Sequence, residues 1–239
     1  GGRVVAEDRV VQVRGYTRTM IKTMQAQVQV PHFGYSDEYE VEGVINLRKR
    51  LLPLAEERGK RLTYMPIIIK ALSVALEDFP EINSKLSQDH GSITYVGSHN
   101  VGIAVDSPAG LVVPNIKGLQ NLSILEVASE LARLSEAART NSLKPADLEG
   151  GTITLSNVGA IGGTYTAPIL MPGEACIGAM GAIERIPRYD ADGTLVPTKV
   201  MRMSWSADHR LLAGATLARF SNRFKALLSD PSLMLLALR

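Results

Sequence analysis

The chain has 239 residues, 45% of them hydrophobic and 21% charged, a composition that is typical of an ordinary globular protein. Its 26 lysines and arginines nearly balance 24 acidic residues and are scattered along the chain, so nucleic acid is not an expected partner. No apolar run approaches the roughly 18 residues that cross a bilayer, so a membrane is not an expected partner either.

The single cysteine and the first residues bear on compartment and domain organisation. Cys176, being alone, excludes an intramolecular disulfide and a cysteine-cluster metal site, and it fits a reducing compartment. It lies in an apolar run, so buried packing is its expected role. Residues 1–14 are polar and charged and begin with Gly rather than Met, so we expect a linker remnant there. No stretch rich in Pro, Gly and Ser interrupts residues 15–239, which predicts one domain.

The spacing of apolar residues predicts the secondary structure in chain order. The expected helices span residues 16–28, 44–58, 66–79, 123–139 and 215–228. The expected strands span residues 33–41, 93–96, 101–105, 110–114, 152–156, 175–183 and 195–206. Several strands follow one another without a helix between them, so a mixed sheet covered on one face by helices is favoured over a doubly wound parallel sheet. The expected fold class is therefore α/β or α+β, as a two-layer sandwich.

Local signals mark the ends of these elements. Ser123 followed by Glu126 forms a capping box that opens the fourth helix. Gly59 is the expected cap of the second helix. Residues 187–197 combine prolines with Asp and Gly, which is typical of a β-hairpin rather than a domain boundary.

Several motifs that carry catalytic chemistry are absent from the sequence. There is no serine-hydrolase elbow, no P-loop, no zinc-protease helix motif and no dinucleotide-binding glycine pattern after a strand. The glycine-rich residues 159–163 lack the spacing for dinucleotide binding. They suit either a tight turn or a close approach of the backbone to a ligand.

Two polar residues lie at the ends of predicted strands, where loops often carry functional groups. His209 follows the strand over residues 195–206, and Ser156 ends the strand over residues 152–156. A structural role is open for both, because a histidine often packs in a core and a serine at a strand end often caps or turns the chain. The functional alternative for Ser156 is a hydroxyl that donates to a developing oxyanion. The histidines outside this position, His32, His90 and His99, are more typical of structural or surface roles.

Two segments together resemble a known family. Residues 151–164, Gly-Thr-Ile-Thr-Leu-Ser-Asn-Val-Gly-Ala-Ile-Gly-Gly-Thr, and residues 206–210, Ser-Ala-Asp-His-Arg, are similar to motifs of the dihydrolipoyl acyltransferase catalytic domains, which form the cores of the 2-oxo acid dehydrogenase complexes. The resemblance covers about residues 15–239 and includes residues 101–106, 110–114 and the closing Met-Leu-Leu at 234–236. It implies an acyltransferase catalytic domain with a chloramphenicol-acetyltransferase-like fold, assembled as trimers with active sites at subunit interfaces.

The acyl group is indicated by residues 31–38, Pro-His-Phe-Gly-Tyr-Ser-Asp-Glu, which look most like the branched-chain 2-oxoacid dehydrogenase transacylases. This likeness implies an enzyme of the dihydrolipoyllysine-residue 2-methylpropanoyltransferase type. An acetyl-specific dihydrolipoyl acyltransferase is the nearest alternative, and plain strand packing without a role in selectivity is open for the segment. An antibiotic acetyltransferase is disfavoured by this segment and by the apolar tail.

The resemblance also implies roles for individual residues in moving an acyl group from dihydrolipoamide to coenzyme A. His209 would be the general base that deprotonates the thiol, and Ser156 would stabilise the oxyanion. No metal is implied. The residues that the resemblance places near coenzyme A are Arg48, Thr63, Asp106, Ser135, Ser156, Asn157, Gly181 and Ile183.

Partners and assembly are implied in the same way. The acyl donor would be a lipoyl group on a domain that is absent from this chain, and the decarboxylase and dihydrolipoamide dehydrogenase components would bind the assembled core. A homotrimer that forms a cubic particle of 24 chains is expected, docked through the apolar tail Leu233, Met234, Leu235, Leu236 and Leu238. The implied compartment is the mitochondrial matrix, with the bacterial cytoplasm as the alternative.

The sequence departs from the family pattern at Ala213, where the family carries a second aspartate after the Asp-His-Arg motif. We expect that aspartate to pair with a basic residue of the first helix, for which Arg18 is the candidate here, so that restoring it raises turnover and stability together. Its loss keeps open a function of another class, a catalytically weakened core that serves as a scaffold for partner enzymes.

Overall fold

The computed structural model describes residues 8–108 and 110–237 of the chain. Its helices are α1 (Gly15–Gln27), α2 (Glu42–Glu56), α3 (Met65–Asp78), α4 (Ile124–Arg139), α5 (Pro145–Leu148) and α6 (Gly214–Ser229), with the 3-10 turns η1 (Pro80–Asn83), η2 (Leu119–Asn121) and η3 (Pro231–Ala237). Its strands are β1 (His32–Glu40), β2 (Ser84–Leu86), β3 (Ile93–Tyr95), β4 (Val101–Ile103), β5 (Val105–Ser107), β6 (Gly110–Val112), β7 (Asn115–Ile116), β8 (Ile153–Asn157), β9 (Cys176–Tyr189) and β10 (Leu195–Asp208). Over this part of the chain, no helix combines the length and the apolar character needed to span a membrane.

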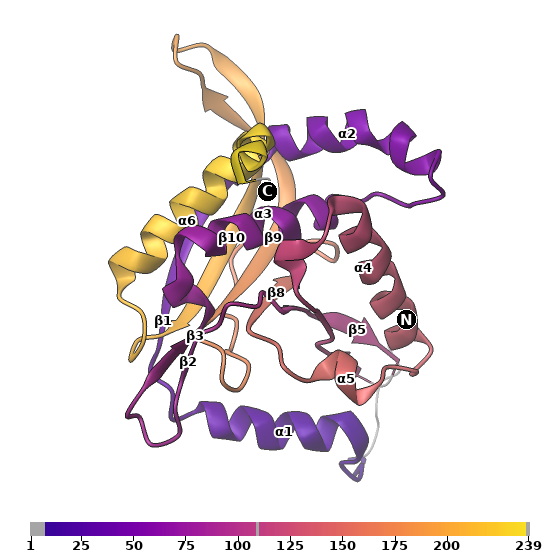
Figure 1. The fold of residues 1–239 in the computed structure, drawn as a ribbon, viewed down its shortest axis with the longest axis vertical. Coiled ribbons are helices and arrows are strands. Elements are labelled where there is room, and N and C mark those ends of the chain that lie inside the picture. The colour runs from indigo at the N-terminus through magenta and orange to yellow at the C-terminus, as the bar shows by residue number, and fades with distance from the viewer. Residues whose placement is uncertain (1–7, 109, 238–239) are drawn as a thin grey trace.

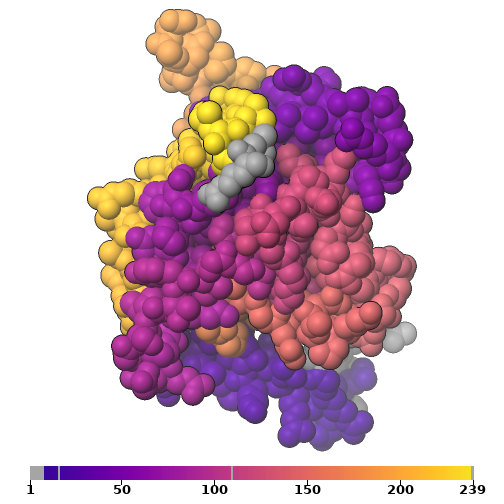
Figure 2. Space-filling view, viewed as in Figure 1, coloured from indigo at the N-terminus to yellow at the C-terminus, as the bar shows by residue number. Residues whose placement is uncertain are grey.

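One mixed sheet of six strands organises the molecule. Its strand order is β1-β10-β9-β8-β4-β7, and the remaining short strands form the two-stranded pairs β2-β3 and β5-β6. The β1, β10 and β9 strands are antiparallel, whereas β9, β8 and β4 are parallel, so the mixed sheet predicted from the sequence is confirmed. The β9-β10 hairpin runs beyond the sheet and projects from the body of the molecule (Figures 1 and 2).

Helices α3 and α6 cover one face of this sheet, as Figure 1 shows. The core between the layers contains an aromatic cluster in which the rings of Trp205 and Phe220 meet edge to face, with centroids 5.1 Å apart. The buried polar atoms of this cluster are paired, because Trp205 Nε1 donates to Tyr39 Oη at 3.0 Å and that oxygen lies 2.6 Å from Ser221 Oγ. Burial raises the pKa of the Tyr39 hydroxyl, which keeps it neutral.

The elements expected from apolar spacing are present, with ends that differ by a few residues. The capping box is confirmed, since Ser123 N donates to Glu126 Oε2 at 2.8 Å and Glu126 N donates to Ser123 Oγ at 3.3 Å. The expected strand over 101–105 is instead divided between β4 and β5, and β9 continues to Tyr189. Residues 8–14 of the expected linker have no regular secondary structure, and residues 1–7 lie outside the described residues.

Cys176 is buried at the start of β9, as the apolar run around it predicts. Burial in an apolar environment raises the pKa of its thiol, so the thiolate is disfavoured. Cys176 therefore packs as a small apolar side chain.

The contact between α2 and the end of α6 gives a test of the packing. A Cβ added at Gly43 would lie 2.0 Å from the carbonyl oxygen of Ser229. Helix propensity alone predicts that Gly43→Ala raises the free energy of unfolding by about 1 kcal/mol. The contact predicts the opposite sign, a loss of about 1–3 kcal/mol, because backbone must shift to admit the methyl group.

Urea unfolding of the two proteins decides between these signs. Gly97→Ala is the matched control, since a Cβ there meets nothing within 4 Å. An equal or greater stability of Gly43→Ala would contradict the packing of α2 against α6.

Candidate active site

The Asp208-His209-Arg210 segment leaves the sheet at the end of β10, and its backbone is held from two sides. Asp208 N donates to Ala175 O at 3.0 Å, and His209 N donates to Pro31 O at 2.9 Å. These bonds come from the residues that precede β9 and β1. The backbone of His209 is therefore fixed by the two neighbours of β10 in the sheet.

The Asp208 carboxylate forms an ion pair with Arg210. Asp208 is 4% exposed, and Arg210 Nη2 donates to its Oδ2 at 2.7 Å while the Arg210 backbone N donates to its Oδ1 at 2.9 Å. This carboxylate raises the pKa of the Arg210 guanidinium, which stays charged. Asp208 and Arg210 thus form an ion pair within the motif, and the imidazole of His209 between them takes no part in that pair.

The His209 side chain is exposed and lies against one aromatic ring. Its imidazole is tilted by 42° against the ring of Phe33, with centroids 4.4 Å apart. Among the described residues, no hydrogen bond involves either of its ring nitrogens. Both nitrogens are therefore open to a substrate or to a group from another subunit.

Ser156 lies at the end of β8, where the chain turns into the glycine-rich loop. The loop follows β9 closely, because Val158 N and Gly159 N both donate to Met180 O at 3.1 Å. A Cβ at Gly159 would lie 2.1 Å from Gly181 O. The sequence left open whether the glycines form a tight turn or let the backbone approach a ligand. The structure shows a close approach between two segments of this chain, and Gly181 also lies against the carbonyl oxygen of Thr164.

The structure does not bring Ser156 and His209 together within one chain. Ser156 pairs with Ala179 on β9, which pairs with Ser204 on β10, and His209 follows Ser204 by five residues. A rise of about 3.3 Å per residue and a step of about 4.8 Å per strand place their Cα atoms about 19 Å apart. A hydrogen bond between the two side chains of one subunit is excluded by this separation.

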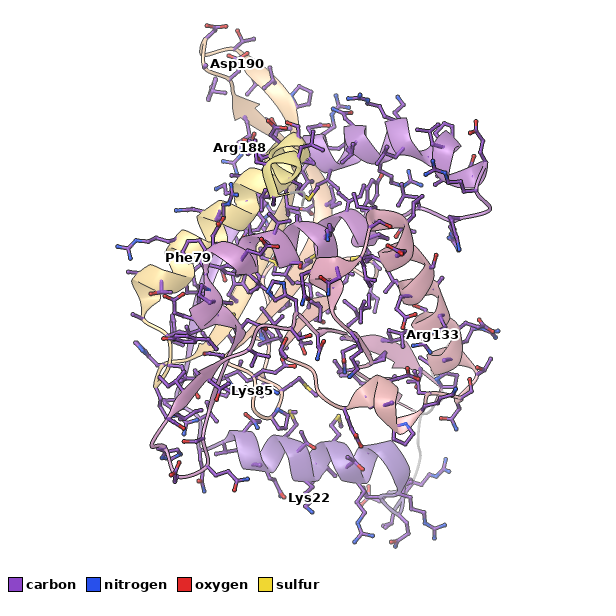
Figure 3. The ribbon with its side chains drawn as sticks, in the orientation of Figure 1. Lys22, Phe79, Lys85, Arg133, Arg188 and Asp190 are labelled. Carbon is purple, nitrogen blue, oxygen red and sulfur yellow. The ribbon has the colours of Figure 1, made fainter. Side chains whose placement is uncertain are left out.

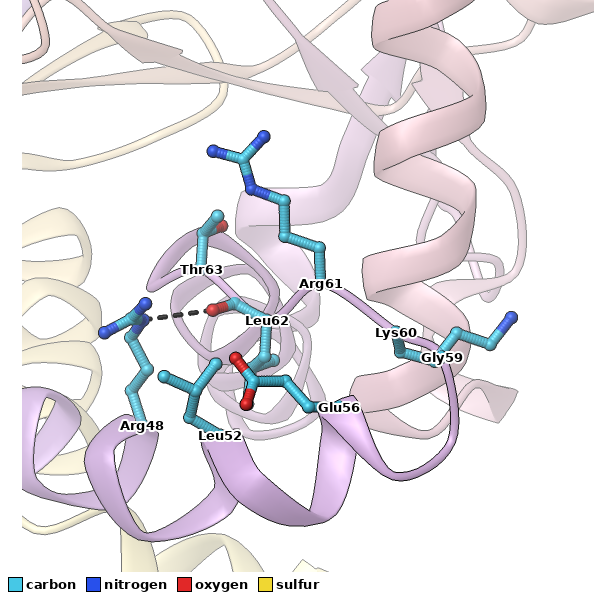
Figure 4. A pocket seen from close by; sticks show the side chains of 8 residues that line it. All are labelled: Arg48, Leu52, Glu56, Gly59, Lys60, Arg61, Leu62 and Thr63. Carbon is cyan, nitrogen blue, oxygen red and sulfur yellow. Dashed lines mark hydrogen bonds between the residues drawn. The ribbon is translucent and has the colours of Figure 1, made fainter.

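Arg48 and Thr63 line a cavity of about 440 Å³ between α2 and the start of α3 (Figure 4). Arg48 is held in place, since its Nε donates to Leu62 O at 3.0 Å and its guanidinium lies 4.9 Å from the centroid of the Tyr64 ring. Lys60 and Arg61 add positive charge to the same cavity, and with Arg48 they outnumber its one acidic lining residue among the described residues, Glu56. The cavity suits an anionic ligand such as a phosphate group.

Ser156 and Asn157 lie on the same side of the molecule as this cavity. Asn157 Nδ2 contacts Met65 Sδ at 3.5 Å, and Met65 follows Thr63 by two residues. The remaining predicted residues are accessible at different elements: Asp106 on β5 and Ser135 on α4 are exposed, and Ile183 on β9 is 39% exposed. Gly181 is buried. One chain thus presents Arg48, Thr63 and the end of β8 together, apart from His209.

A second cavity, of about 290 Å³, lies behind the Asp208-Arg210 pair and is also lined by Glu174. Glu174 is 8% exposed, and burial raises its pKa to about 7. Thr154 Oγ1 donates to its Oε1 at 3.1 Å, while its Oε2 is buried without a partner among the described residues. The sequence interpretation missed this residue, although a lone acid at the entrance to an apolar strand was the available signal. Within the described residues, no cluster of three or more His, Cys, Asp or Glu side chains is placed to hold a metal ion.

Ala213 occupies the N-cap position of α6, which differs from the expected setting. Its backbone is extended, with φ −82° and ψ 150°, and its carbonyl oxygen accepts from Thr216 N and Leu217 N. No described hydrogen bond or ion pair involves Arg18, which is exposed on α1. A side chain at 213 is thus placed to cap a helix. An Arg18 without a partner among the described residues agrees with the loss of the aspartate, and the pairing of an aspartate at 213 with Arg18 stays a prediction.

Ala213→Asp should raise the free energy of unfolding by about 1 kcal/mol, because a carboxylate at the N-cap accepts from the free N–H groups of the first turn and complements the helix dipole. Ala213→Asn should give a similar gain without the charge. Ala132→Asp, at an exposed position inside α4, is the control and should slightly lower stability. Urea titrations measure all three, and an unchanged or lower stability of both 213 variants would contradict the capping role.

Comparisons with known proteins agree with this architecture. The family model of the 2-oxoacid dehydrogenases acyltransferase (catalytic domain) matches residues 5–236. The lipoamide acyltransferase components of the mitochondrial branched-chain alpha-keto acid dehydrogenase complex from Caenorhabditis elegans and Mus musculus are 48% and 46% identical, over 98% of this chain and 52% and 48% of theirs. The acetyltransferase component of the pyruvate dehydrogenase complex from Bacillus subtilis is 33% identical, over 94% of this chain and 51% of its own. This chain spans about half the length of these relatives.

Solved structures show the same fold. Dihydrolipoamide acetyltransferase from Azotobacter vinelandii, studied for the role of a serine, a histidine and an asparagine in its catalytic mechanism, superimposes with a TM-score of 0.92 at 30% identity, covering 96% of this chain and 94% of that one. A structure of the cubic core of the pyruvate dehydrogenase multienzyme complex gives the same values. Chloramphenicol acetyltransferase matches with a TM-score of 0.57 at 14% identity over 92% of this chain and 99% of its own. The predicted chloramphenicol-acetyltransferase-like fold is confirmed.

Proposed function

Because this chain belongs to the 2-oxoacid dehydrogenase acyltransferase family, we propose that it transfers a branched-chain acyl group between dihydrolipoamide and coenzyme A. The branched-chain assignment is supported by identities of 46–48% to relatives named for the branched-chain complex, against 33% to one named for the pyruvate complex. We assign this reaction to a catalytic domain over residues 15–239, preceded by a linker over residues 1–14. The observation that carries the proposal is an accessible imidazole on a fixed backbone at the end of β10.

The proposed reaction needs a base and an oxyanion donor. The His209 imidazole takes the proton from the coenzyme A thiol, and the thiolate attacks the carbonyl carbon of the acyl thioester. The Ser156 hydroxyl donates to the resulting oxyanion. The intermediate then expels the dihydrolipoamide sulfur, which receives the proton from the imidazolium. The acetyltransferase from Azotobacter vinelandii was studied for a serine and a histidine in its mechanism, which supports these two roles.

We place the active site between two subunits of a homotrimer. The separation of Ser156 from His209 within one chain supports this arrangement, because a shared site supplies the base from one chain and the oxyanion donor from its neighbour. The chain that supplies Ser156 also supplies Arg48 and Thr63, so it would hold coenzyme A through its phosphates. Asp106, Ser135, Asn157, Gly181 and Ile183 complete the proposed coenzyme A residues.

The proposed setting is the core of a multienzyme complex. The acyl donor is a lipoyl group on a separate domain, and the partners are the decarboxylase and the dihydrolipoamide dehydrogenase of the complex. The superposition on a cubic core supports a particle of 24 chains, and the mitochondrial relatives support the matrix as the compartment. A catalytically weakened scaffold is the second candidate, since Ala213 stands where the family pattern has an aspartate, four residues after His209.

Subunit complementation tests the proposed site. His209→Ala and Ser156→Ala should each lower turnover by about a hundredfold or more while the protein stays folded. When the two variants are co-expressed, random assembly gives about a quarter of the sites both intact residues, so about a quarter of the activity should return. Acyl transfer from isobutyryl coenzyme A to dihydrolipoamide is the measurement, with acetyl coenzyme A as the specificity control.

Three outcomes have distinct meanings. No recovery in mixed trimers would contradict the shared site, whereas full activity of His209→Ala would contradict its role as base. An inactive parent protein that still forms the particle would support the scaffold instead.

The C-terminal tail gives a test of the proposed assembly. Met234 is buried in the chain's own core and Leu233 packs against it, whereas Leu235 and Leu236 are 65% and 84% exposed. Leu238 lies outside the described residues. The double variant Leu235→Lys, Leu236→Lys should therefore leave trimers intact and abolish larger particles in light scattering. Ile93→Lys, on the β2-β3 hairpin, is the control, and an unchanged particle size of the double variant would refute docking through these leucines.

A further inference from the structure

The start of β1 lies beside His209 and is itself rigidly held. His32 and Phe33 pair with Asp208 and Ala207 of β10. The His32 ring connects two other segments, since Leu170 N donates to its Nε2 at 3.2 Å and its Nδ1 lies 2.7 Å from Val30 O. Because Nε2 accepts, the proton is on Nδ1, which donates to the carbonyl oxygen. The backbone that carries Phe33 is thus tied to β10 and to the loop before β9.

Phe33 occupies the space between the imidazole and the start of α6. Its ring centroid is 4.4 Å from that of His209. A Cβ built on Gly214, the first residue of α6, would lie 3.9 Å from Phe33 Cε2. Phe33 is half-buried and also packs against the core, so its ring cannot swing away without losing apolar contact. One face of the imidazole therefore meets a side chain of defined position.

An imidazole that acts as a base is commonly oriented by a hydrogen bond to its second nitrogen. Among the described residues His209 makes no such bond, and the nearby carboxylate of Asp208 is bound to Arg210. Among the described residues, the side-chain contact given for the imidazole is the one with the ring of Phe33. Packing against a fixed neighbour is one of the two ways, with hydrogen bonding, in which the rotamer of a catalytic side chain is held.

We propose that Phe33 is a positioning residue that holds the His209 imidazole in the orientation needed to take the proton from the thiol. This inference rests on the proposed role of His209 as the base. Phe33 touches the imidazole and acts only through it. Loss of the ring should therefore lower kcat and leave the KM for coenzyme A nearly unchanged, because Arg48 and Thr63 lie elsewhere.

Four variants test the inference by steady-state kinetics of acyl transfer. Phe33→Ala should lower kcat by about tenfold to a hundredfold, the loss that follows a displacement of about 1 Å in a reacting group, with KM changed by less than about twofold. Phe33→Tyr keeps the planar ring and should restore kcat to within about twofold. Phe79→Ala is the matched control and should keep kcat. Phe79 follows the last residue of α3 (Figure 3), and its half-buried ring has its centroid 6.0 Å from that of Phe220.

The fourth variant, His209→Ala, distinguishes failure of the positioning role of Phe33 from failure of the proposed function. If it is inactive while Phe33→Ala keeps full kcat, the positioning role is wrong and the proposed function stands. If His209→Ala is itself fully active, the proposed function fails. Equal losses of kcat in Phe33→Ala and Phe79→Ala would also overturn the inference, because they would reflect general loosening. If Phe33→Ala does not fold, Phe33→Leu takes its place, and an unchanged kcat in that variant would overturn the inference in the same way.

Discussion

The pairing of β10 between β9 and β1 is the constraint on which the other features depend. This pairing continues into the projecting β9-β10 hairpin. It also fixes the position of Trp205 in the core and the point at which the chain leaves the sheet at His209. A shift of this register by one residue would turn Trp205 away from α6 and would exchange buried and exposed side chains along the strand. The same hydrogen bonds therefore fix the positions of the core residues and of His209. A packing defect in β10 would displace His209 as well.

The long elements could be predicted from the sequence because their signals are local. Periodic apolar residues, the Ser123 capping box and the hairpin residues near Pro187 each act within a few positions of the chain. Strands of two or three residues, such as β2 and β7, have no such signal, because they are too short to show an alternation of apolar and polar residues. The division of residues 101–105 follows from strand pairing, since β4 joins β8 and β7 in the main sheet whereas β5 pairs with β6 in a separate hairpin.

The residues of the proposed site could be named one by one from the sequence, but their arrangement in space could not. Ser156 and His209 could be found as polar residues at strand ends, and the resemblance supplied their roles. Their separation of about 19 Å is visible only after the register across three strands is known. The contact of Phe33 with His209 also depends on pairing between distant strands, and so does the isolation of Glu174, whose burial raises its pKa to about 7.

The distribution of groups on one chain links catalysis to assembly. One surface presents the basic cavity at Arg48 with Ser156 nearby, and the imidazole is exposed beyond the other end of the strand ladder. The two surfaces are complementary: the cavity is lined by no histidine, and among the described residues neither ring nitrogen of His209 has a hydrogen-bond partner. A neighbouring subunit that brings the two surfaces together would supply the oxyanion donor to the imidazole. It would also exclude water from the thiol and thioester, which strengthens hydrogen bonds to the developing charge. In the proposed site, trimer formation would therefore be a condition for the chemistry itself and not only for the architecture of a larger particle.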